Sequence, residues 1–301
     1  MTYPPQPPHE PHPNHDRGLE FDLSTLMSRR SLGMFLGAGT AAALAACTPG
    51  GSATGAASAT ATAGPAAASF GTAAASGTPS ASASPTLTRA IAECGVEIPA
   101  ETAGPYPGDG SNGANVLTES GVVRSDTTSS FGSSTTMAEG IPLTVTMTIN
   151  DFSENKSPLA GGAVYLWHCN RDGQYSLYSQ PIAGENYLRG VQETDDKGQV
   201  KFTTILPACY DGRWPNIHFV VYPSLAKATN SANKIATSQM ALPEDIVKVA
   251  YATAGYEQSV TNLSKVTLAG DNVFGDGYDL QIPTVTGDPT TGYTLKFTCA
   301  V

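Results

Sequence analysis

A period-two alternation of apolar and polar side chains runs through Pro142-Leu143-Thr144-Val145-Thr146-Met147-Thr148-Ile149. This period is typical of a β-strand with one buried face, because successive side chains of a strand point to opposite faces. Threonine and valine are β-branched, which also favours a strand. The stretch therefore predicts a strand that packs one of its faces against a core.

Similar short runs recur downstream, at 163–167, 199–205, 217–222 and 293–298. Asp195-Asp196-Lys197-Gly198 lies between two of them and predicts a hairpin turn. The segment 243–251 instead begins with proline and two acids, which favours a short helix. We therefore expect an all-β domain over residues 90–301, a β-sandwich with one or two short helices.

The region before this domain has a different composition. Two arginines, Arg29 and Arg30, precede an apolar stretch that ends in Leu44-Ala45-Ala46-Cys47. These are the parts of an export signal, with a twin-arginine-like start and a lipobox-like end. Residues 1–47 therefore predict a lipoprotein signal, with Cys47 lipidated and the mature protein anchored in the cell envelope at the outer face of the cytoplasmic membrane. A buried Ala-rich helix is the alternative for the apolar stretch.

Residues 48–89 are almost entirely Ala, Ser, Thr, Gly and Pro. Such a segment buries too little apolar surface to offset its ordering entropy, so it predicts a disordered tether. The formal net charge of the whole chain is −10. An acidic chain lacks the basic face that a nucleic-acid partner requires, so no nucleic-acid partner is expected.

The cysteine count favours two disulfides. Five cysteines are present, and if Cys47 carries lipid an even number remains in an exported domain. Of the three possible pairings we favour Cys169–Cys209 with Cys94–Cys299, because the second pair would join the two ends of the domain. A cysteine-based metal site is the rival interpretation, but no CxxC spacing supports it.

Two tracts concentrate the unusual side chains, 167–176 and 205–219. They contain both tryptophans of the chain and both histidines that follow Cys47, His168 and His218. Arg213 and two tyrosines also lie in these tracts. This gathering predicts a functional site rather than ordinary packing.

The tracts resemble the intradiol ring-cleavage dioxygenases, the superfamily of catechol 1,2- and protocatechuate 3,4-dioxygenases. That family holds non-haem Fe(III) on two tyrosinates and two histidines. Thr102-Ala103-Gly104-Pro105-Tyr106 is similar to the motif that opens the family's domain. The resemblance implies the family's sandwich fold, Fe(III) as cofactor, and a site that includes Tyr175, Tyr210, Arg213 and His218.

One position departs from the family pattern, because Asn216 stands where the first histidine of the family's His-x-His pair is expected. Residues 216 and 218 share one face of a strand, so both can face one metal ion. An amide is a much weaker ligand than an imidazole. His168 is an alternative substitute ligand, and an ordinary buried strand histidine is the other interpretation of it.

The resemblance implies an enzyme that cleaves a catechol-type aromatic diol with O₂ and gives a muconate-type diacid. Tyr175 would be the tyrosinate that leaves the iron and takes a proton, and Arg213 would stabilise developing negative charge. Asn216 supports an alternative, a catalytically impaired binding module in the envelope. A generic adhesion sandwich is a third hypothesis, but it does not explain the two tracts.

Overall fold

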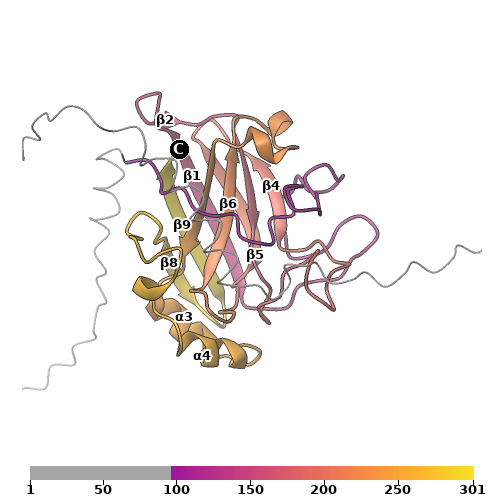
Figure 1. Cartoon of the computed structure of the whole chain (residues 1–301), viewed down its shortest axis with the longest axis vertical. Helices are drawn as coiled ribbons and strands as arrows, with labels where there is room; N and C mark the ends of the chain where they lie inside the picture. Colours follow the sequence, from indigo (N-terminus) through magenta and orange to yellow (C-terminus); the bar gives the residue numbers. More distant parts are fainter. Residues whose placement is uncertain (1–95) are drawn as a thin grey trace, which may run out of the picture.

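The structure is a computed structural model that describes residues 96–301. The predicted signal, tether and lipidation site, and Cys94, lie outside these residues. Residues 96–301 form two sheets, two α-helices, three short 3-10 helices and the loops between them (Figure 1). The strands are β1 (Pro142–Asp151), β2 (Ser157–Pro158), β3 (Ala163–Trp167), β4 (Arg189–Glu193), β5 (Gln199–Ile205), β6 (Asn216–Tyr222), β7 (Ala236–Ala241), β8 (Thr284–Asp288) and β9 (Gly292–Ala300), and the helices are α3 (Glu244–Tyr251) and α4 (Glu257–Leu263).

One sheet has the order β2-β1-β9-β8, with β5 also paired to β1, and the other has the order β4-β3-β6-β7. In β1, Leu143, Val145, Met147 and Ile149 are buried while the residues between them are half-buried. These side chains pack against Ile217, Phe219 and Val221 of β6 in the core between the sheets. The predicted all-β sandwich is therefore confirmed.

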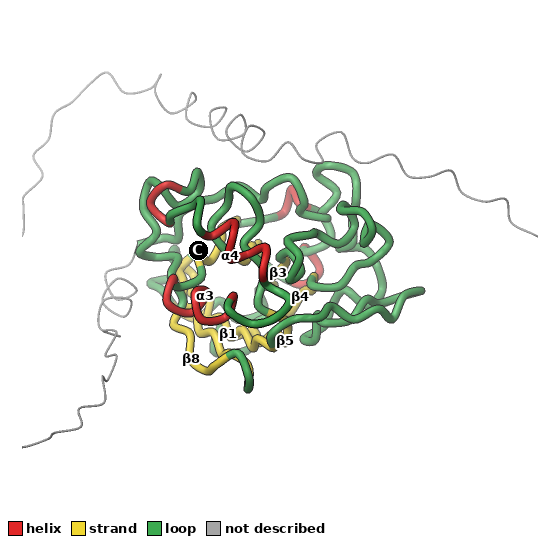
Figure 2. The backbone as a smooth tube through the Cα atoms, turned by 90° about the horizontal axis from the view of Figure 1, so that it is seen from below, coloured by secondary structure: helices red, strands yellow, loops and turns green. Residues whose placement is uncertain are grey.

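The second sheet is buried on both faces, since every residue of β3 and β6 is buried. One face of β6 packs in the core between the sheets, and the other joins a second apolar cluster with Tyr165 and Trp167. Loops pack against that outer face and bury it. The tube view, seen from below, shows how much of the trace around the strands is loop, with α3 and α4 in front (Figure 2).

The turn at 195–198 is present, but the two strands that it joins do not pair with each other as the strands of a hairpin do. Gly198 adopts a φ of 69°, and the Gln199 carbonyl accepts a hydrogen bond from Asp195 N at 3.0 Å. However, β4 pairs with β3 and β5 pairs with β1, so the turn connects the two sheets. The hairpin prediction was wrong because local turn chemistry does not determine which strand pairs with which.

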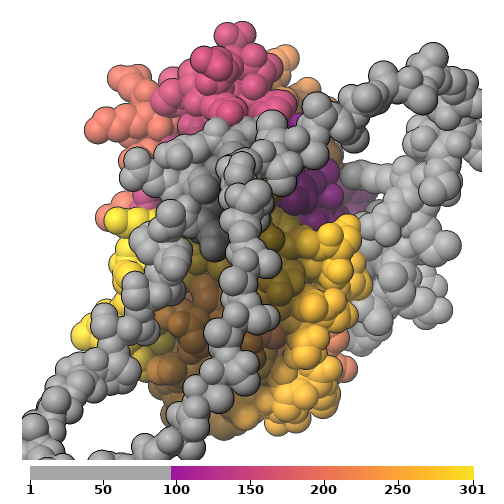
Figure 3. All heavy atoms as spheres, turned by 90° about the vertical axis from the view of Figure 1, so that its left-hand side faces the viewer, coloured from indigo at the N-terminus to yellow at the C-terminus, as the bar shows by residue number. Residues whose placement is uncertain are grey.

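The expected helix at 243–251 is confirmed as α3, with Pro243 at its N-cap. Residues from the last third of the chain, coloured orange to yellow, form the lower half of one face of the molecule (Figure 3). Among residues 96–301, neither helix has the length and apolar character needed to cross a membrane.

Candidate functional site

Strand β6 directs Asn216 and His218 to the outer face of its sheet, away from the core between the sheets. In the register of the sheet, His218 lies opposite Trp167 on β3 and opposite Gln239 on β7. Its ring stacks on the Trp167 indole at 4.9 Å with an interplanar angle of 8°. His218 is 3% exposed, and its Nδ1 is buried without a hydrogen-bond partner. The imidazole is therefore held rigidly with one unsatisfied nitrogen.

The loop after β3 brings Tyr175 to His218. The Asn170 side chain accepts hydrogen bonds from Asp172 N and Gln174 N, which closes the turn before Tyr175. Tyr175 is 2% exposed, and its Oη lies 3.3 Å from His218 Nε2. Its ring meets the Tyr210 ring edge-on, with centroids 5.8 Å apart. The two tyrosines and the histidine thus converge from three different segments.

The helical pair α3–α4 supports the segment that carries Tyr210. The Tyr251 hydroxyl donates to Pro207 O at 2.9 Å, and the Tyr256 hydroxyl donates to Leu206 O at 2.7 Å. From α4, Ser259 Oγ accepts from Cys209 N and Asn262 Nδ2 donates to Cys209 O. Four side chains therefore fix the backbone immediately before Tyr210.

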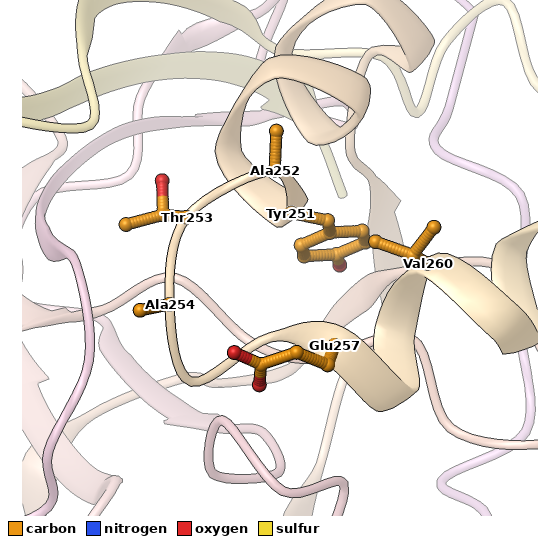
Figure 4. A pocket seen from close by; sticks show the side chains of 6 residues that line it. All are labelled: Tyr251, Ala252, Thr253, Ala254, Glu257 and Val260. Carbon is orange, nitrogen blue, oxygen red and sulfur yellow. The ribbon is translucent and has the colours of Figure 1, made fainter.

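A surface pocket of about 480 Å³ lies where α3 turns into α4, and Figure 4 shows Tyr251 and Val260 next to each other in its lining. The residues that line it are Tyr251, Ala252, Thr253, Ala254, Glu257 and Val260. None of the predicted site residues is among them. The chemistry predicted from the two tracts is therefore not located in this pocket.

Arg213 lies on the far side of Tyr210 and is 3% exposed. Its Nη1 donates to Tyr210 Oη at 3.5 Å, and its Nη2 donates to Gln239 Oε1 at 2.8 Å. Its Nε forms a buried ion pair with Asp271 at 3.0 Å. Gln239 and Asp271 are site residues that the sequence analysis missed, because neither lies in a tract with a distinctive motif.

The Thr102–Tyr106 stretch crosses the same site. Gly104 has a φ of 69°, and a Cβ built there would lie 3.4 Å from His218 Cε1. The Tyr106 ring lies 4.9 Å from the Tyr175 ring. Tyr106 and Tyr210 are only half-buried, whereas Tyr175, Arg213 and His218 are buried.

Asn216 lies beside this cluster in a defined orientation. Its Nδ2 donates to Trp214 O at 2.7 Å, and its Oδ1 is buried without a partner. Only the amide nitrogen can donate to a carbonyl, so the oxygen is the atom left free. An unsatisfied buried carbonyl oxygen is costly, and ligand binding is one way to satisfy it.

Burial governs the protonation of these groups. It raises the pKa of Tyr175 well above its ordinary value, and neighbouring Tyr210 raises it further. Burial also lowers the pKa of His218 well below its ordinary value, and Arg213 lowers it further. Without a cation the tyrosine is therefore a neutral phenol and the histidine a neutral imidazole. A bound metal cation reverses the preference of a phenol, as it does for metal-bound water.

The residues present fit a ferric ion. Within residues 96–301 no three His, Cys, Asp or Glu side chains gather to hold a metal, so a metal here depends on the tyrosines. The donor set is two phenol oxygens, a neutral imidazole whose Nε2 lies beside Tyr175 Oη, and an unsatisfied amide oxygen. Oxygen-rich sets of this kind suit a small, highly charged cation.

His168 does not join this cluster. Its Nδ1 lies 2.8 Å from Cys169 O and its Nε2 lies 2.7 Å from Thr204 Oγ1. The carbonyl can only accept, so the proton sits on Nδ1 and Nε2 accepts from the threonine. With both nitrogens engaged, His168 is a satisfied core histidine and not a substitute ligand.

A pH dependence of folding follows from His168. Burial lowers its pKa from 6.5 to about 4. The unfolded chain therefore takes up this proton at a higher pH than the folded protein does, and stability is lost as the pH falls from about 6.5 towards 4. Between pH 7 and pH 5 the loss from this group is about 2 kcal/mol. Urea unfolding at both pH values should show a smaller loss for His168→Gln than for the wild type; equal losses would contradict this account.

The predicted Cys169–Cys209 disulfide is wrong, because both residues are free buried thiols. Cys169 packs in the outer cluster and Cys209 in the core between the sheets. Cys169 Sγ contacts Ala208 O, whereas Cys209 Sγ contacts Arg213 O. Cys299 is likewise a free buried thiol, so the structure does not bear out the Cys94–Cys299 pairing either; Cys94 itself lies outside the described residues.

A β-sandwich with a Tyr–Tyr–His cluster beside a buried arginine defines the class of site. Comparisons with known proteins show what the chain is similar to. The family model described as "Dioxygenase" matches residues 123–221. The chain is 31% identical to chlorocatechol 1,2-dioxygenase of Rhodococcus opacus over 55 residues, which are 18% of this chain and 21% of that protein. It is 34% identical to catechol 1,2-dioxygenase 2 of Acinetobacter lwoffii over 59 residues, which are 20% of this chain and 21% of that protein.

Among solved structures, an intradiol ring-cleavage dioxygenase from Tetranychus urticae is similar, with a TM-score of 0.49 and 24% identity over 60% of this chain and 86% of that chain. The predicted resemblance to the intradiol ring-cleavage dioxygenases is confirmed by the family match and the curated relatives. The match spans 21% of the length of each of these relatives. Tyr175, Tyr210, Arg213, Asn216 and His218 all lie within 123–221, whereas Gln239 and Asp271 lie beyond it.

Proposed function

We propose that this domain binds Fe(III) and uses O₂ to cleave a catechol-type aromatic diol between its two hydroxyl-bearing carbons. Both atoms of O₂ enter the product, a muconate-type diacid, so no external reductant is needed. The observation that carries the proposal is the convergence of Tyr175, Tyr210 and His218 beside Arg213. Tyr175, Tyr210 and His218 would hold the ion, with Asn216 Oδ1 as a fourth, weaker donor.

When bound, ferric iron would supply the positive charge that favours phenolate forms and the electron acceptor that lets the diolate react with O₂. The chain's own residues have separate tasks. Tyr175 accepts a proton from the diol, because its burial strongly favours the phenol. Arg213 stabilises negative charge that develops beside Tyr210.

Access and exclusion of water follow from the exposure of the site residues. Arg213, Asn216 and His218 are 3%, 2% and 3% exposed, so they are shielded from solvent. Tyr106 and Tyr210 are half-buried. We infer that the diol approaches on the side of these two rings, where an aromatic substrate can pack against them. A water-poor site strengthens the electrostatic effect of Arg213.

The first test is reconstitution of the purified protein with ferric iron. Tyrosinate coordinated to Fe(III) absorbs visible light, so the protein should turn burgundy. Oxygen uptake with catechol, hydroxyquinol and protocatechuate then distinguishes an active enzyme from a protein that binds iron without catalysis. A protein that binds iron without oxygen uptake would favour the second candidate function, an impaired binding module, which Asn216 specifically supports.

Residue 216 offers the most informative substitution. Asn216→His replaces a neutral amide by an imidazole on the same face as His218, and we expect iron affinity to rise by about 10-fold or more. Asn216→Ala removes the amide oxygen and should lower affinity. Both are measured by competition with a chelator, followed at the visible band. Equal affinity in the wild type and both variants would show that residue 216 does not face the metal.

We also propose that the domain is exported and anchored in the cell envelope through lipid on Cys47. Support for this comes from the sequence of residues 1–47 and 48–89. A tether after a lipidated cysteine would hold the domain away from the membrane surface.

A further inference from the structure

Asp271 is a buried carboxylate that lies next to the proposed site and outside the family match. Its Oδ2 accepts from Arg213 Nε at 3.0 Å and from Trp214 N at 2.6 Å. Its Oδ1 accepts from Val273 N at 2.9 Å and from Phe274 N at 3.2 Å. The side chain is 0% exposed. Four donors therefore fix the carboxylate, and one of them is the guanidinium of Arg213.

The other donors of Arg213 point toward the site. Nη1 reaches Tyr210 Oη at 3.5 Å and Nη2 reaches Gln239 Oε1 at 2.8 Å. Gln239 is itself held, because its Nε2 donates to Thr102 O at 2.9 Å. A guanidinium is planar, so fixing Nε on one side determines where its other nitrogens lie.

The charge of this pair matters as much as its geometry. Arg213 is buried, and an isolated buried cation is strongly disfavoured. Asp271 supplies the counter-charge at Nε of Arg213, whereas Nη1 is the nitrogen that reaches Tyr210. Without it, the guanidinium would gain by turning toward water and leaving Tyr210.

We propose that Asp271 is a positioning residue for ring cleavage, because it holds Arg213 against Tyr210 and Gln239. This inference rests on the proposed function. Asp271 acts through Arg213 and touches neither the iron nor the diol. Its predicted signature is a change at Tyr210, in the absorption of the iron-loaded protein, together with a loss of turnover.

Asp271→Asn is the direct test. An asparagine has one carbonyl oxygen and cannot serve both pairs of donors. We expect kcat to fall about 10–100-fold at full iron loading, a typical cost of losing a partner that orients a metal site, and the tyrosinate band to shift. The matched control is Asp288→Asn, an exposed aspartate that accepts hydrogen bonds from Thr290 and Thr291. This control should leave both the band and kcat unchanged.

A second variant keeps the proposal testable if Asp271→Asn does not fold. Arg213→Lys keeps the charge opposite Asp271, but a single ammonium cannot span Tyr210 and Gln239 together. We expect the same band shift and loss of kcat, and in this background Asp271→Asn should add little. An unchanged band and kcat in Arg213→Lys, or in a folded Asp271→Asn protein, overturns the proposal.

Measurements on the wild-type protein distinguish a failure of the role proposed for Asp271 from a failure of the proposed function. A wild type that binds no iron overturns both. A wild type that binds iron and cleaves catechol, with Asp271→Asn indistinguishable from it, overturns only the role of Asp271.

Discussion

A Tyr210→Phe variant is expected to bind ferric iron roughly 100-fold more weakly than the wild type, or worse, and to lose measurable ring cleavage. The substitution removes one oxygen donor and leaves the ring in place. Loss of a partner that only orients a ligand costs about 10–100-fold, so loss of a ligand should cost at least the upper part of that range. The α3–α4 side chains that hold residues 206–209 do not depend on the Tyr210 hydroxyl. The fold should therefore survive.

The matched control for this variant is Tyr222→Phe. Tyr222 is a fully buried tyrosine on β6, and its hydroxyl has no hydrogen-bond partner. Removing it leaves no other group unsatisfied, so stability should be unchanged or slightly higher. Iron content by elemental analysis and the visible spectrum are compared for both variants. A Tyr210→Phe protein with the same iron affinity as Tyr222→Phe would show that Tyr210 is not a ligand.

The second large effect concerns Arg189, a fully buried arginine on β4. Its guanidinium donates to the carbonyls of Tyr106, Pro107 and Ser176, at 3.0, 3.0 and 2.9 Å. It also donates to Ser176 Oγ and Tyr165 Oη. Gly108 leaves room for it, since a Cβ there would lie 2.9 Å from Nη1. One side chain thus ties the segment beside Tyr106 to the loop that carries Tyr175.

Arg189→Met should lower the free energy of unfolding of the metal-free protein by about 3–5 kcal/mol. The carbonyls of Tyr106 and Ser176 lose their donor, whereas Pro107 O keeps the Tyr165 hydroxyl. Each unsatisfied group costs about 1–3 kcal/mol, and removal of a buried charge offsets part of this. Because whole domains are stable by only about 5–15 kcal/mol, the variant should be close to unfolding.

Urea unfolding of the metal-free protein measures the effect of Arg189→Met. Arg171→Met is its control, because Arg171 is partly exposed and its ion pair is with the exposed Glu139. Exposed pairs contribute up to about 1 kcal/mol. Equal destabilisation by the two substitutions would contradict the role given to Arg189.

The sequence was sufficient to predict the sandwich and the residues of the two tracts that come together in the structure, because both depend on local patterns. Alternation in β1 determines which side chains enter the core. The two tracts contain Tyr175, Tyr210 and His218 at spacings that resemble those of the intradiol dioxygenases. Side chains alternate along a strand, so Asn216 and His218, two residues apart, point to the same face. These features need no knowledge of how distant segments meet.

Long-range pairing could not be predicted in the same way. The turn after Asp195 is correctly formed, yet it joins strands of different sheets. Asp271 reaches Arg213 across 58 positions, and no motif marks it. The even number of cysteines after Cys47 favours a disulfide between Cys169 and Cys209, but their thiols lie in different apolar clusters. In each case the three-dimensional packing decides the outcome, and local chemistry does not constrain it.

We propose that Tyr175, Tyr210 and His218 hold ferric iron in spite of Asn216. The test is reconstitution of the purified protein with ferric iron, followed by removal of excess metal, elemental analysis and visible spectroscopy. We predict about one iron per chain and a burgundy tyrosinate band that shifts when catechol is added. A colourless, iron-free protein under these conditions would contradict the account.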